Sequence, residues 1–160
     1  MLYAEMNVYF KEGNIMSEFE INTLLNNGLI QQALYAFAFL FATWFAGRCA
    51  VVTNESGNAN LFSKIVITGF GLSSIYYVNL QFTYVDFHIR NYAHSLYNLK
   101  ASGAEISSRG ESAIEIFGAG NASEIPGMSL LPSDPIGIIF IASLTLIILS
   151  AIWMGGSNND

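Results

Sequence analysis

The sequence predicts an all-α integral membrane protein with three transmembrane helices and a short N-terminal amphipathic helix. Its composition is the first reason. Of 160 residues, 52% are hydrophobic and 11% are charged, with a mean hydropathy of +0.43, whereas a soluble domain carries about 25% charged residues. The second reason is three long stretches without charge, each near the length that a roughly 30 Å hydrocarbon core requires. A soluble fold of this size would have too few polar residues to cover three such helices.

The uncharged stretches are Leu29–Gly47, Ile65–Val85 and Ile136–Met154. We expect the corresponding helices to cover about 29–52, 62–85 and 135–154. The second helix is expected to continue toward 99, since neither Pro nor Gly occurs between Leu72 and Ser102.

The third helix has defined ends. Asp134 is placed to cap its first turn and Pro135 suits the first helical position. The pair Gly155-Gly156 is typical of a helix stop. Because this stretch is almost entirely Ile and Leu, we expect it to be the most lipid-exposed of the three.

The N-terminal segment, 1–28, contains a helix start. Ser17 and Glu20 fit a capping box, and Ile21, Leu24 and Leu25 fall on one helical face. Two interpretations stay open. The segment 17–28 is either an amphipathic helix that lies flat at the membrane interface and turns at Gly28, or the first turns of the spanning helix.

Residues 1–15 carry a different signal. The codons of Lys11-Glu12-Gly13 form a purine run that resembles a bacterial ribosome-binding site, shortly before Met16. We therefore hypothesise that translation starts at Met16 and that the gene is bacterial or belongs to a bacterial virus.

Two loops separate the predicted spans, and a short tail, 155–160, follows the last one. Residues 52–60 form a polar turn. Residues 100–134 form a long acidic loop in which Ala113–Phe117 is compatible with a short strand, while the rest is expected to be solvated.

The basic residues predict an orientation. Arg48 and Lys64 flank the short loop, while Arg90 and Lys100 follow the second span. By the positive-inside rule, the first helix favours an N terminus outside, the short loop inside, the acidic loop outside and the C terminus inside. The expected location is the bacterial inner membrane.

The second helix carries most of the polar information. At about 100° per residue, a set of polar and aromatic side chains falls within an arc of roughly 80°. We call this set the stripe; it consists of Tyr76, Asn79, Thr83, Asp86, Arg90 and His94. Asp86 and Arg90 are spaced for an ion pair. The stripe is predicted to face protein or water and to act as an interaction surface.

Small residues predict where helices approach one another closely. On the first helix, Ala38, Ala42, Ala46 and Ala50 recur every four residues. On the second, Gly69 and Ser73 form a small-xxx-small pair.

No catalytic, metal or cofactor site is expected. His88 and His94 point about 120° apart on a helix, so they would not share a metal ion without further ligands. A formal net charge of −6 argues against binding to nucleic acid.

Three functions remain open. The first is a non-catalytic accessory or scaffold subunit of a membrane complex, with the lipid bilayer and other membrane subunits or a second copy as partners. The second is a holin-like pore former of a bacterial virus. The third is a component of a membrane enzyme or transporter that uses Asp86, Arg90 and His94 at the interface.

Overall fold

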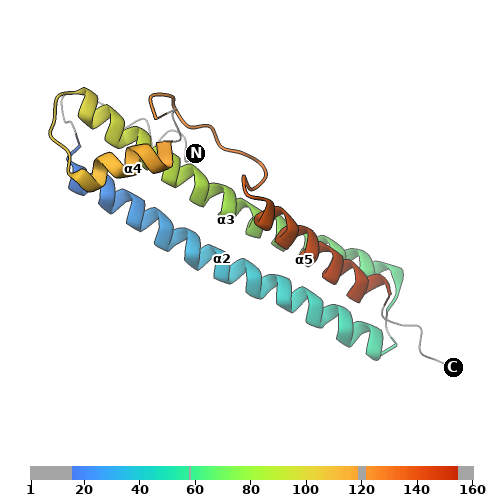
Figure 1. The fold of residues 1–160 in the computed structure, drawn as a ribbon. Coiled ribbons are helices and arrows are strands. Elements are labelled where there is room, and N and C mark those ends of the chain that lie inside the picture. The colour runs from blue at the N-terminus through green and yellow to red at the C-terminus, as the bar shows by residue number, and fades with distance from the viewer. Residues whose placement is uncertain (1–15, 58, 119–121, 155–160) are drawn as a thin grey trace. The chain divides into compact units, whose positions relative to one another are not determined.

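A computed structural model of the chain describes residues 16–57, 59–118 and 122–154. These residues form four α-helices and no strand (Figure 1). The helices are α2 (Glu18–Glu55), α3 (Leu61–Ala101), α4 (Ser108–Gly118) and α5 (Pro135–Trp153). The hypothesis of a start at Met16 concerns residues 1–15, which lie outside the described residues, as do the tail and its predicted helix stop at 155–156.

Three of these helices, α2, α3 and α5, are long and apolar enough to cross a membrane. The prediction of an all-helical chain with three long apolar helices is therefore confirmed. Helix α5 has 19 residues, close to one bilayer crossing, whereas α2 and α3 have 38 and 41. The two longer helices therefore have several turns more than a crossing requires.

The capping box at the start of α2 is present. The Glu20 carboxylate accepts a hydrogen bond from the Ser17 amide at 2.8 Å, and Ser17 Oγ accepts one from the Glu20 amide at 3.3 Å. Beyond this cap α2 is one continuous helix, with no break at Gly28. The separate amphipathic helix that turns at Gly28 is therefore not seen, and 18–28 are the first turns of α2. A single glycine costs a helix only about 1 kcal/mol, which does not by itself end it.

The chain divides into two compact units, and both long helices contribute to each. Unit 1 comprises Met1–Gly28 with His88–Gly127, and unit 2 comprises Leu29–Phe87 with Met128–Asp160.

Unit 2 contains the apolar parts of α2 and α3 together with α5. Its core is a small cluster of buried aliphatic side chains from all three helices: Ala46, Ala50, Ile75, Ile148 and Ile152. The rings of Phe82 and Phe140 meet edge to face, 5.9 Å apart, and Trp153 Nε1 donates to Thr68 Oγ1 at 3.2 Å. Because Phe82 meets the start of α5 and Thr68 meets its end, α5 runs antiparallel to α3.

Exposure does not single out α5. In the most apolar window of each helix, 17% of α2 and of α5 is buried within the chain, against 22% of α3. The expectation that α5 is the most lipid-exposed helix stays a prediction, because burial within the chain does not distinguish α5 from α2. Three helices packed side by side each bury one narrow face, whatever their composition, and α2 leaves as much of its surface outside as α5 does.

Unit 1 has its own core, formed where the start of α2 and the end of α3 meet α4. The buried residues are Ile21, Tyr92, Leu96, Leu99 and Ala113. The suggestion of a short strand at Ala113–Phe117 is wrong, since these residues lie inside α4. Gly110 and Ala113 are buried three residues apart and Ile114 packs on the same core, which is helical spacing rather than alternation.

Gly71 and Gly69 give a matched test of the packing in unit 2. A Cβ atom at Gly71 would lie 2.8 Å from Ile148 Cγ2, whereas one at Gly69 would meet no atom within 4 Å. We expect Gly71→Leu to lower the free energy of unfolding by about 1–3 kcal/mol relative to Gly69→Leu, because the added side chain overpacks the contact with α5. Thermal unfolding of the monomeric fraction in one detergent measures the difference. Equal stability of the two variants would contradict the contact.

Candidate functional site

The stripe on α3 does not form a single exposed surface. Tyr76 is exposed, with 53% of its surface accessible. Asp86 and Arg90 are half-buried, and Asn79, Thr83 and His94 are buried. The structure therefore places most of the stripe against the chain itself.

Three side chains of the stripe hold backbone carbonyl groups of the segment between α4 and α5. In unit 1, Arg90 Nη2 donates to the Gly127 carbonyl at 2.9 Å, and His94 Nδ1 donates to the Ala122 carbonyl at 2.7 Å. In unit 2, Asn79 Nδ2 donates to the Leu130 carbonyl at 2.8 Å. These three residues of the stripe thus contact the chain's own connecting segment.

The two hydrogen bonds of His94 define its tautomer. Since a carbonyl oxygen can only accept, Nδ1 carries the proton, and Nε2 then accepts from Asn98 Nδ2 at 3.0 Å. Both ring nitrogens are satisfied inside the protein. His94 therefore acts as a structural link between α3 and the segment that follows α4.

His88 occupies a different place in unit 1. The His88 ring lies against the backbone of α2 at Gly28. If Gly28 carried a Cβ atom, this atom would lie 3.2 to 3.3 Å from three atoms of the ring. The absence of a side chain at Gly28 thus allows the imidazole to lie against α2, and burial lowers the pKa of His88. His88 thus lies against Gly28, whereas His94 forms hydrogen bonds with Ala122 and Asn98. Within the described ranges, no three His, Cys, Asp or Glu side chains converge on a metal position.

A small cavity of about 180 Å³ lies beside Arg90 in unit 1. Its described lining is mostly apolar and consists of Arg90, Phe117, Gly118, Ala122, Glu124, Ile125, Pro126 and Gly127. Arg90 and Glu124 are the charged members.

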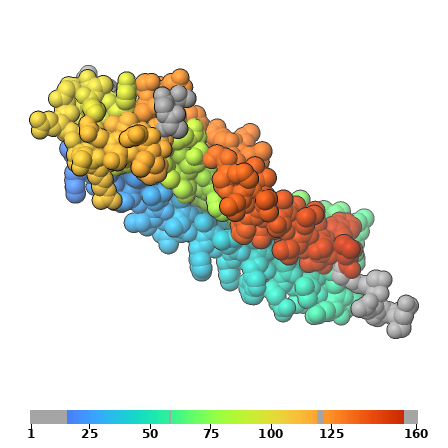
Figure 2. Space-filling view, viewed as in Figure 1, coloured from blue at the N-terminus to red at the C-terminus, as the bar shows by residue number. Residues whose placement is uncertain are grey.

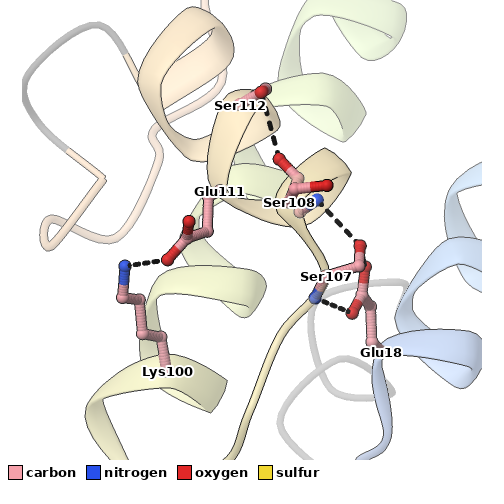
Figure 3. Close-up of polar contacts among 7 residues, drawn as sticks. Glu18, Lys100, Ser107, Ser108, Glu111 and Ser112 are labelled. Carbon is pink, nitrogen blue, oxygen red and sulfur yellow. Dashed lines mark hydrogen bonds and ion pairs between the residues drawn. The ribbon is translucent and has the colours of Figure 1, made fainter.

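Glu18 joins the start of α2 to the start of α4 (Figure 3). Its carboxylate accepts from the Ser107 amide at 2.8 Å and from Ser107 Oγ at 2.5 Å. Ser107 Oγ in turn accepts from the Gly110 amide at 3.1 Å, as an N-cap residue does. These hydrogen bonds from Ser107 hold the pKa of Glu18 below its usual range. One turn further along, Lys100 Nζ and Glu111 Oε1 form an ion pair at 2.6 Å.

The predicted packing residues divide into two groups. Ala46 and Ala50 are buried in the core of unit 2, and Ala42 is half-buried. In contrast, Ala38, Gly69 and Ser73 are exposed. Helices of this chain therefore use only part of the small-residue surface that the sequence identified.

Several contacts in unit 1 were not anticipated from the sequence. They include the Glu18–Ser107 link, the His94–Asn98 pair and the hydrogen bond from Tyr92 to Asn22 Oδ1 at 2.8 Å. Only α4 had a readable signal, because Ser107 is followed by Gly110, Ala113 and Ile114 at helical spacing. The other pairs join positions that are distant in sequence or that lack a motif.

Comparisons with protein-family models, with curated proteins and with solved structures find no match.

His94 provides a test of the link in unit 1. We expect His94→Leu to lower the free energy of unfolding by about 1–3 kcal/mol, because the half-buried Ala122 carbonyl and the Asn98 amide lose their partner. Unfolding in detergent measures the change, with Tyr97→Leu as the control at an exposed position of the same helix. If both variants lose the same stability, the His94 hydrogen bonds contribute nothing specific.

Glu18 predicts a pH dependence. Because its pKa is lowered in the folded state, its contribution is complete above the ordinary glutamate pKa and is lost as the pH falls through the lowered value. We expect hydrogen-exchange protection of the first amides of α4, corrected for intrinsic exchange, to fall between about pH 5 and pH 3. In Glu18→Gln the protection should be weaker and independent of pH in this window.

Glu20 is the control for this experiment. Its pKa is also lowered, but by hydrogen bonds from Ser17 at the start of α2. Glu20→Gln should therefore leave the pH profile of α4 unchanged. Loss of the profile in this variant, or its persistence in Glu18→Gln, would contradict the assignment to Glu18.

Proposed function

We propose that the chain is a multi-pass membrane protein that works as a non-catalytic accessory or scaffold subunit. In this proposal α2, α3 and α5 cross a bacterial inner membrane, with the N terminus outside and the C terminus inside. Its partners are lipid and either other membrane subunits or a second copy of the chain. In this role the protein packs against partner helices and catalyses no reaction.

The observation that supports this proposal is a small-residue face of α3 that no helix of unit 2 covers. A Cβ at Gly69 would meet no atom within 4 Å, and Ser73, one turn away, is exposed. Tyr76 continues the same face, three residues further, with 53% of its surface accessible. Within a bilayer, small residues of this kind allow two helix backbones to approach closely.

The polar residues of the stripe favour packing for a second reason. Asn79, Arg90 and His94 already bind backbone carbonyls of the chain. A membrane enzyme or transporter component that used Arg90 and His94 would first have to release these hydrogen bonds. The arrangement supports a rigid support protein better than a reactive site.

Association in a membrane tests the proposal. We expect the protein, purified in a mild detergent and returned to vesicles, to be recovered as a complex or an oligomer by chemical cross-linking. Gly69→Ile should reduce the cross-linked fraction, because its side chain prevents close approach. Ala142→Ile is the matched control, since Ala142 is an exposed small residue on α5.

Two outcomes would contradict the proposal. One is a monomer in both detergent and vesicles. The other is equal association of the two variants and the unaltered protein. Rapid loss of membrane potential on expression in bacteria would instead favour the holin-like pore.

A further inference from the structure

The seven residues before α5, Met128–Asp134, combine backbone hydrogen bonds at Leu130, Leu131 and Asp134 with two exposed leucines. They belong to unit 2, together with the apolar parts of the long helices, and they run beside α3 before they enter α5 (Figure 1). The segment is not helical. Leu130 and Leu131 are nevertheless 74% and 62% exposed.

Side chains bind the backbone of this segment at Leu130 and Leu131. The Leu130 carbonyl accepts from Asn79 Nδ2 at 2.8 Å. The Leu131 amide donates to Ser129 Oγ at 3.2 Å, and the same hydroxyl donates to the Leu131 carbonyl at 2.7 Å. Pro132 has no N–H group to satisfy.

The end of the segment is closed by the cap of α5. Asp134 Oδ1 accepts from the Gly137 amide at 2.6 Å, and the Asp134 carbonyl accepts from the Ile138 amide at 3.3 Å. Side chains thus bind backbone groups of both leucines while the leucine side chains are exposed, and Ser129, Ser133 and Asp134 are exposed as well. Exposed leucines are unfavourable in water.

We infer that Met128–Asp134 lies within the bilayer and that lipid acyl chains cover Leu130 and Leu131. Non-helical backbone is tolerated at membrane depth only where protein groups satisfy it, and Asn79 supplies the partner of the Leu130 carbonyl. Asn79 lies six residues before Val85, the predicted end of the second span, which corresponds to a depth of about 9 Å. The Leu130 carbonyl that it binds therefore reaches below the membrane surface.

Lipid is the expected neighbour of Leu130 and Leu131 because these side chains continue the exposed aliphatic surface of α5. Ile136 and Ile139, just after the segment, are also exposed aliphatic residues. Figure 2 shows the side chains before α5 and those of α5 on one face. A helix long and apolar enough to cross a membrane presents this face to lipid, and the two leucines extend the same aliphatic surface beyond its first turn. The role of Asn79 is therefore to position a lipid-facing segment, independently of any association through Gly69.

Collision accessibility of a spin label tests the inference. The full chain carries Cys49→Ala and one cysteine, Leu131→Cys, bearing a nitroxide, in phosphatidylcholine vesicles. We expect the label to collide with oxygen in preference to a water-soluble nickel chelate, as a label at Ile139→Cys should. A label at Ser102→Cys, an exposed residue next to the end of α3, should show the opposite preference.

Two results at Leu131 would overturn the inference. A preference for nickel would place the segment in water, and poor collision with both reagents would place it under a partner protein or a second copy. Neither result would alter the cross-linking through Gly69, so failure here is distinguishable from failure of the proposed function.

The contribution of Asn79 is tested on the same label. Asn79→Leu removes the donor at a similar side-chain volume, and we expect nickel collisions at Leu131 to rise about tenfold. Asn79→Gln keeps an amide donor and should give a smaller change. Identical accessibility in Asn79→Leu and the unaltered protein would overturn the role of this hydrogen bond.

Discussion

The fold depends on one constraint, which is that hydrocarbon offers no partner for a backbone N–H or C=O group. Three apolar stretches can meet it only by forming helices that bond internally, and α2, α3 and α5 do so. The constraint also explains why the polar residues of α3 matter. Where the chain leaves regular structure before α5, a side chain from α3 replaces the missing helical partner, as Asn79 does for the Leu130 carbonyl.

Polar side chains on α3 therefore form hydrogen bonds within the chain itself. Arg90 and His94 hold the Gly127 and Ala122 carbonyls in unit 1. Ser107, bound by Glu18, caps α4 in the same unit. These contacts fix the connection between the second and third apolar helices by side chain to backbone hydrogen bonds, which require little of the sequence of the connecting segment itself. The surface that we propose for association is the exposed small-residue face around Gly69.

The sequence predicted the three long helices and their caps because both signals are local. Uncharged length identifies a helix of membrane type, and the Asp134 and Ser17 caps are read within four residues. It failed where the outcome depended on residues far apart in the chain. Helix α4 was interpreted as loop and strand although its cap residue Ser107 and its helical spacing are local; its packing on Tyr92 and Leu96 and the support of its cap by Glu18 depend on distant residues. The periodicity of α3 located the stripe correctly on one helix, but periodicity alone does not say whether another protein or the same chain covers it.

The central claim is that the chain crosses a membrane three times. Its most direct test is the labelling of single cysteines by a membrane-impermeant maleimide in sealed bacterial spheroplasts and in inverted vesicles, with Cys49 replaced by Ala. A cysteine at Ser56, between α2 and α3, should react only from one side of the membrane. A cysteine at Ser102, after α3, should react only from the other side, since α3 separates the two positions. Labelling of both positions from the same side, or recovery of the protein in the soluble fraction, would contradict the account.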